Sequence, residues 1–214
     1  MTPVLCHWLT PAVLFMVLIG GPARADYQPL PLTELFATSD LVALGNIAAV
    51  DETTFVVEDY QVLAGAPPEA PLVVKRFRDW SGNARWSPYR AGQRVLLFLT
   101  AAESTPSGKP IWKIRGLGDE GEMPVEDGYV YPQGIYLDGF VQQQYEVQHG
   151  RLQGYRFVLE DFLSALHGYN RCYRADVQEG KRRQVTIHQI CDAQALQRYR
   201  DASPLNRYLV RLSE

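Results

Sequence analysis

The segment 77–90 is the part of the chain whose residue types most directly suggest ligand binding. It brings together aromatic rings and guanidinium groups, at Trp80, Arg85, Trp86, Tyr89 and Arg90. Indole rings offer flat stacking surfaces, and arginines contact anions. We therefore predict a binding loop that uses these five side chains. In the alternative, which we favour, the tryptophans fold back to close a barrel end and the arginines stack on them.

A second group of chemically useful side chains is acidic. Five carboxylates fall within a short stretch, at Asp119, Glu120, Glu122, Glu126 and Asp127. A pair of them could serve a hydrolase, and a cluster could hold calcium, although the spacing of a calcium loop is missing. We favour a solvated acidic turn over both.

The sequence contains no recognisable catalytic motif. It lacks the nucleophile elbow, the paired zinc histidines, the paired cysteines and the phosphate-binding glycine loop. His149, His167 and His188 are far apart, and none has a second ligand residue one helical turn away. We therefore predict no catalytic residue, no metal and no cofactor.

The N-terminus is typical of a secretory signal peptide. An apolar run, Ala12–Ile19, precedes Ala23-Arg24-Ala25, the small-x-small pattern of a cleavage site. We predict that residues 1–25 are removed and that the protein is periplasmic or secreted. The run is too short for a membrane span, so no stable span is expected after cleavage. A retained anchor is the alternative.

The mature chain would keep two cysteines, Cys172 and Cys191. In an exported protein they predict one disulfide, and two unpaired buried thiols are the alternative. They flank a predicted hairpin, 172–177 with 185–190. A turn centred between Lys181 and Arg182 would place the cysteines opposite each other. Closing a loop of about 20 residues contributes about 3 kcal/mol.

The elements that must position these residues are mostly strands. A short helix is expected at 32–36, and strands at 41–50, 53–63, 72–77, 94–100 and 111–115, followed by a hairpin turning at Asp127-Gly128. The run 95–99 fits a strand buried on both faces. Helical patterns begin near Leu159, Asp192 and Ser203. The fold class is therefore mainly β with α: an OB-like antiparallel barrel at 26–157, then a disulfide-tied helix–hairpin–helix part at 158–214.

Charged side chains are also distributed unevenly along the chain. The net charge is -3. Residues 26–150 carry 9 basic and 17 acidic side chains, whereas residues 151–214 carry 11 basic and 7 acidic side chains. This balance argues against nucleic-acid binding. We interpret the asymmetry as attraction between the two parts, with a basic face for lipid headgroups or a cell-wall polymer as the alternative.

Three segments resemble a known family. Residues 39–47 (SDLVALGNI), 60–65 (YQVLAG) and 92–99 (GQRVLLFL) are similar to the strand motifs of netrin-like and tissue-inhibitor-of-metalloproteinase-like domains, a series that recurs in exported bacterial proteins. The resemblance covers about residues 32–116 and implies a five-stranded OB-like barrel. It carries no inhibitor function, because the predicted mature end at Asp26 has no cysteine for a protease metal.

These observations predict an exported, non-catalytic binding module with an envelope protein or polymer as partner. A periplasmic hydrolase using the carboxylates of 119–127 and a protease-inhibitor-like protein are the alternatives.

Overall fold

The structure is a computed structural model, and it describes residues 29–68, 71–80, 83–104, 110–116, 119–178 and 184–214. The predicted signal peptide, residues 1–25, lies outside the described residues.

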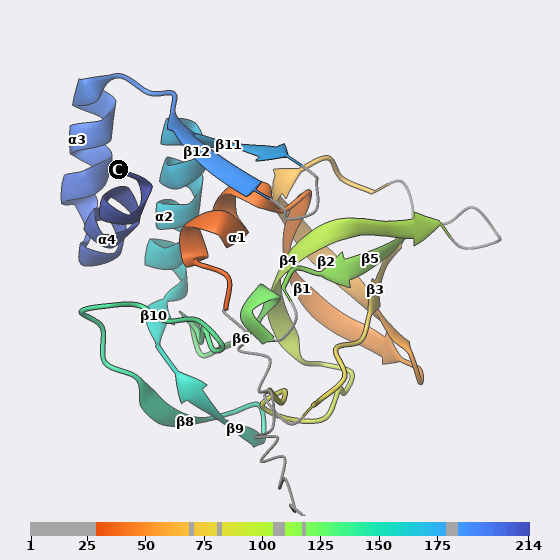
Figure 1. The fold of residues 1–214 in the computed structure, drawn as a ribbon. Helices are drawn as coiled ribbons and strands as arrows, with labels where there is room; N and C mark the ends of the chain where they lie inside the picture. The colour runs from red at the N-terminus through yellow and green to blue at the C-terminus, as the bar shows by residue number, and fades with distance from the viewer. Residues whose placement is uncertain (1–28, 69–70, 81–82, 105–109, 117–118, 179–183) are drawn as a thin grey trace, which may run out of the picture.

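Five strands form a closed barrel (Figure 1). They are β1 (Leu41–Val50), β2 (Thr54–Gly65), β3 (Leu72–Lys75), β4 (Arg94–Ser104) and β5 (Pro110–Ile114). The strand order is β1-β2-β3-β5-β4, and a β1–β4 pairing closes the ring. The predicted barrel is confirmed, with one correction: β3 and β5 pair in parallel, so the barrel is mixed.

The strand β4 separates two hydrophobic clusters, which confirms its predicted burial on both faces. Val95, Leu97 and Leu99 point into the barrel. Leu96 and Phe98 belong to a second cluster, which lies between the outer face of the barrel and the helices. All five side chains are buried, because successive residues of a strand face opposite sides.

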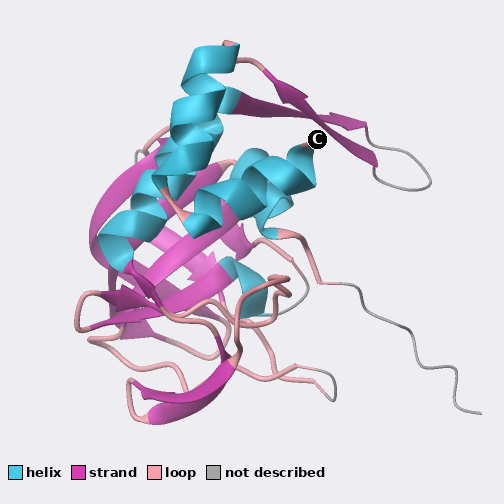
Figure 2. Ribbon diagram, turned by 90° about the vertical axis from the view of Figure 1, so that its left-hand side faces the viewer, coloured by secondary structure: helices cyan, strands magenta, loops and turns pink. Residues whose placement is uncertain are grey.

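Helices cover that outer face (Figure 2). The helices of the described residues are α1 (Leu32–Thr38), α2 (Leu159–Cys172), α3 (Ala193–Ala202) and α4 (Pro204–Ser213), and α3 packs on α2 and α4. The helix α1 confirms the predicted first helix. Asp192 caps α3 and Ser203 caps α4, each accepting a hydrogen bond from a backbone N–H of the first turn.

Three short strands extend the sheet beyond the barrel: β6 (Glu122–Glu126), β7 (Tyr129–Val130) and β10 (Phe157–Val158). The 3-10 helix η1 (Asp119–Gly121) precedes them, and β8 (Gln143–Val147) and β9 (Gly150–Gly154) form a separate hairpin. The predicted turn at Asp127-Gly128 is confirmed, with φ of 51° and 79°. A two-residue turn with positive φ at both positions matches the twist of the hairpin β6–β7.

The predicted disulfide between Cys172 and Cys191 is present. The hairpin beside it consists of β11 (Tyr173–Gln178) and β12 (Gln184–Gln189). Its register pairs Tyr173 with Gln189, so the predicted alignment of the cysteines is wrong by one residue. Cys172 ends α2, and its carbonyl accepts from Ile190 N–H at 2.8 Å.

The C-terminal part packs on the barrel mainly through apolar side chains. Phe36 of α1 lies against Phe98 of the barrel and Phe162 of α2, with ring centroids 5.7 and 5.6 Å apart. An ion pair between Arg211 and Asp138, 3.3 Å, is well exposed and contributes little. The predicted boundary at residue 157 stays a prediction. Among the described residues no helix is long and apolar enough to cross a membrane.

Candidate functional site

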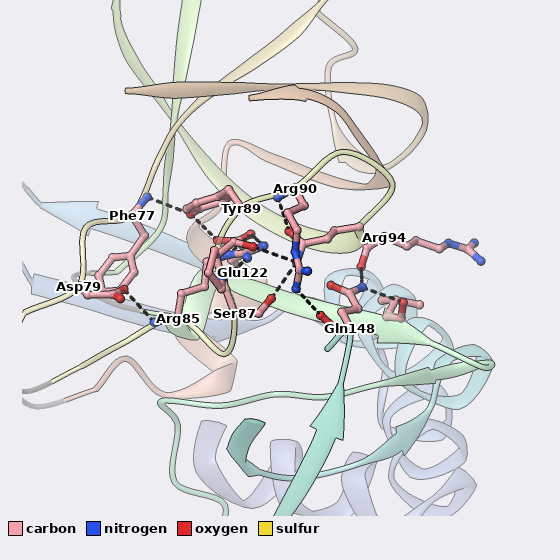
Figure 3. A network of polar contacts seen from close by, with 12 residues as sticks. Phe77, Asp79, Arg85, Ser87, Tyr89, Arg90, Arg94, Glu122 and Gln148 are labelled. Carbon is pink, nitrogen blue, oxygen red and sulfur yellow. Dashed lines mark hydrogen bonds and ion pairs between the residues drawn. The ribbon is translucent and has the colours of Figure 1, made fainter. Parts of the chain in front are cut away.

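The loop that follows β3 is held by a buried ion pair (Figure 3). Arg85 donates from Nε and Nη2 to Oε1 of Glu122 at 3.1 and 2.8 Å. The two side chains are only 3% and 1% exposed. Tyr89 Oη–H donates to the other carboxylate oxygen at 2.7 Å, and Arg85 Nη1 donates to the carbonyl of Ser87 at 2.6 Å. The charges are therefore paired and hydrogen-bonded, as burial requires.

Aromatic rings enclose this ion pair. The guanidinium carbon of Arg85 lies 3.8 Å from the ring centroid of Trp86 and 3.9 Å from that of Tyr89. Tyr89 in turn stacks on Phe55, inside the barrel. Burial and the neighbouring Glu122 carboxylate raise the pKa of the Tyr89 hydroxyl, so it stays a hydrogen-bond donor. Three of the five predicted site residues thus lie in the interior at one end of the barrel.

The other two predicted site residues lie at the surface, in different places. Arg90 is exposed and donates from Nη2 to the carbonyl of Gln148, 3.2 Å away on the β8–β9 turn (Figure 3). Trp80 is 42% exposed. It exchanges backbone hydrogen bonds of 2.9 and 3.0 Å with Asn83, which fix its position relative to that residue. Trp80 and Trp86 line separate hollows, so the two indoles do not form one stacking surface.

Trp80 borders a hollow of about 440 Å³. Its wall is rich in amide and charged side chains drawn from four separate segments: Asn83, Asp119, Gln133, Arg151 and Gln153. The set combines one large aromatic ring with hydrogen-bond donors and acceptors of several kinds.

Gln133 is the most informative residue of this wall. Its side chain is 3% exposed, and its Nε2 donates no hydrogen bond within the described residues. A buried amide without a partner costs about 1–3 kcal/mol. Buried amides of this kind are satisfied by water or by a ligand in most proteins, and Gln133 is one of the residues that line the hollow.

Asp119 places a protonatable carboxyl in the same wall. Burial raises its pKa to about 6, against the lowering effect of the hydrogen bond it accepts from the Asn83 amide. Gly134 allows this arrangement, because its φ is +66° and a Cβ there would come within 2.1 Å of Asp119 Oδ1. The carboxyl can therefore donate or accept a hydrogen bond near neutral pH.

The preferred interpretation of the acidic stretch as a solvated turn is wrong for three of its five carboxylates. Asp119, Glu120 and Glu122 are buried, and only Asp127 is fully exposed. The reason is that Glu122 neutralises Arg85, while Asp119 is held by Asn83. Among the described residues no group of three or more potential ligand side chains is arranged for a metal ion.

Sequence reasoning missed most of the Trp80 hollow. It treated Asp119 as part of an acidic turn, and it assigned no element to 143–154, where β9 carries Arg151 and Gln153. The alternation of exposed Arg151 and Gln153 around buried Leu152 was the available signal. No local pattern marks Gln133.

Comparisons with known proteins add little. No protein-family model and no curated protein matches the chain. A solved crystal structure described as that of a proposed exosome complex RNA-binding protein is similar with a TM-score of 0.26 and 12% identity, over 87% of this chain and 94% of that one. A likeness at that score carries no argument about fold or ligand. The resemblance to netrin-like domains stays a prediction.

Proposed function

We propose that this protein is an exported, non-catalytic binding module, and that the hollow beside Trp80 takes a saccharide unit of an envelope polymer. The single observation that carries the proposal is the composition of that hollow, whose wall combines the exposed ring of Trp80 with the amide residues Asn83, Gln133 and Gln153. The disulfide between Cys172 and Cys191 supports export, because such bonds persist in oxidising compartments.

The residue types around the hollow support a saccharide over other ligands. A sugar ring has an apolar face that packs on an indole and a rim of hydroxyl groups that both donate and accept hydrogen bonds. Trp80 offers the indole, and Asn83, Gln133 and Gln153 offer amides. One positive and one ionisable acidic side chain, Arg151 and Asp119, leave the wall without a strong net charge, which suits a largely neutral ligand.

Binding is favoured over hydrolysis by the number of carboxylates. Glycosidases of the usual kind need two, one as acid and one as base or nucleophile. Among the described residues that line the hollow, Asp119 is the single carboxylate. Glu122 is engaged by Arg85 and Tyr89. The hydrolase and the protease-inhibitor alternatives both stay predictions, and the latter is tested by a panel of proteases.

The test is a binding measurement with defined sugars. The oxidised, exported chain is titrated by calorimetry with β-1,4-linked oligosaccharides of glucose and of N-acetylglucosamine, and the same mixtures are checked for cleavage. Trp80→Ala removes the exposed ring of the hollow. Tyr136→Ala is the matched control, since Tyr136 is 72% exposed and does not line the hollow.

We expect binding that Trp80→Ala weakens about tenfold or more and that Tyr136→Ala leaves unchanged, without cleavage. Absence of binding to every sugar, or equal effects of the two substitutions, contradicts the proposal. Cleavage that Asp119→Asn abolishes would replace it with the hydrolase alternative.

A further inference from the structure

A second hollow, of about 550 Å³, lies where the parallel strands β3 and β5 end. Four basic side chains and three apolar ones contribute to its wall: Lys75, Arg76, Arg78, Lys113, Phe77, Ile111 and Ile114. It shares no lining residue with the Trp80 hollow. The two sites can therefore be tested separately.

Backbone register places the two lysines side by side. Lys75 of β3 is the direct partner of Lys113 of β5, and Thr54 of β2 is the partner of Lys75 on the other side. Their neighbours Val74 and Trp112 pack with the barrel interior, so the lysines share the outer face. Adjacent strands are about 4.8 Å apart, and like charges so placed destabilise a sheet.

The described residues include no carboxylate that forms an ion pair with the four basic side chains of this hollow. None of the described residues that line the hollow is acidic. Two acidic residues, Glu52 and Asp79, line a neighbouring hollow together with Arg76 and Arg78, and Asp79 accepts a hydrogen bond from the backbone N–H of Arg85. Asp51 accepts hydrogen bonds from Thr53 and Thr54 of its own turn. The surrounding region, residues 26–150, has only 9 basic residues against 17 acidic ones. Four of those nine meet in this hollow.

Arg76 is held in position before any ligand arrives. Its Nη1 donates to the carbonyls of Asp51 and Glu52 at 2.7 and 3.3 Å, and its guanidinium carbon lies 4.9 Å from the ring centroid of Tyr89. Its other nitrogens donate no hydrogen bond to the described residues. A fixed guanidinium with spare donors matches the geometry of a phosphate group.

We propose that this hollow binds an anion carrying two or more phosphate groups. Four converging positive charges exceed what one carboxylate or one phosphate balances, and a phosphate cluster would relieve the repulsion between Lys75 and Lys113. Phe77 and Ile111 give an adjoining apolar surface for the group that bears the phosphates. The same chemistry occurs in a soluble oligophosphate and in a phosphate-rich lipid headgroup.

The experiment compares two double variants of the full oxidised chain. Lys75→Gln with Lys113→Gln removes two charges from the hollow. Arg171→Gln with Arg198→Gln removes two charges from the distant groove between α2 and α3, so the net charge of the two variants is equal. Each is titrated with tripolyphosphate and with inorganic phosphate, and each is sedimented with phosphatidylcholine vesicles with and without phosphatidic acid.

We expect tripolyphosphate to bind at least about tenfold more tightly than inorganic phosphate, and the Lys75/Lys113 variant to lose about tenfold in affinity. The Arg171/Arg198 variant should bind as the parent does. The unfolding midpoint of the Lys75/Lys113 variant should stay the same or rise, because a like-charge pair is removed. Vesicle binding that needs Lys75 and Lys113 would identify a lipid headgroup as the source of the phosphates. Equal affinities of the two variants, or no response to either probe, would overturn the proposal.

Discussion

Replacing Glu122 by leucine should remove a large part of the stability of the protein. The carboxylate accepts three hydrogen bonds, from Arg85 Nε and Nη2 and from Tyr89 Oη, in a region from which water is excluded. Without it, Arg85 remains a buried charge whose one side-chain hydrogen bond within the described residues goes to the Ser87 carbonyl, beside the rings of Trp86 and Tyr89. Loss of one partner of a buried ion pair costs about 3–5 kcal/mol.

The assay is equilibrium unfolding in urea under oxidising conditions. Glu122→Leu should lower the free energy of unfolding by about 3–5 kcal/mol. The double variant Arg85→Met with Glu122→Leu should recover at least half of that loss, since the uncompensated charge is gone. Glu146→Leu is the control, because Glu146 pairs with Arg151 on the surface with side chains 79% and 73% exposed. It should change stability by less than about 0.5 kcal/mol.

A loss below about 1 kcal/mol for Glu122→Leu would refute this reasoning, because that is the range of an exposed ion pair. A double variant that is less stable than Glu122→Leu alone would show that the charge of Arg85 is not the source of the loss.

Three further predictions concern the hollow and the disulfide. The pKa of Asp119 is raised from 3.8 to about 6, so between these values the folded protein holds a proton that the unfolded chain has released. The free energy of unfolding should therefore fall by up to about 3 kcal/mol as pH rises from about 4 to 7. Asp119→Asn should remove this part of the urea-unfolding pH profile, and an unchanged profile would contradict it. Gly134→Ala should lower the free energy of unfolding by about 1–3 kcal/mol and weaken sugar binding, because φ at this position is +66° and the added Cβ meets Asp119. A variant as stable as the parent would contradict the close approach of Gly134 to Asp119. Replacing Cys172 and Cys191 by serine should lower the free energy of unfolding by about 3 kcal/mol, since the two cysteines are separated by 19 in sequence. An unchanged free energy of unfolding would mean that the disulfide does not constrain the unfolded chain.

Local patterns in the sequence predicted the elements well. The continuous apolar run of β4, the turn at Asp127-Gly128 and the cap at Ser203 are properties of short stretches, so they can be recognised without knowledge of the fold. The pairing of the two cysteines was also predictable from their number together with the predicted export. Their alignment was not, because both strands of this hairpin are largely exposed, and strands without one buried face specify their register weakly.

The sites were harder to predict because they depend on contacts between distant segments. Arg85 and Glu122 are 37 residues apart, and only the closure of the barrel makes them partners. The segment 77–90 was singled out for its residue types, but those types could not distinguish a buried arginine from a surface one. Gln133 lies in no motif, and its significance comes entirely from its burial beside Trp80.

The most direct test of the proposed binding site is the sugar affinity of Gln133→Leu. Leucine is close in size to glutamine and removes a buried amide whose Nε2 has no partner within the described residues, so the variant should be as stable as the parent or more so. Its affinity for the oligosaccharide that the parent binds should fall about tenfold or more. A stable Gln133→Leu variant that binds the sugar as tightly as the parent would contradict the account.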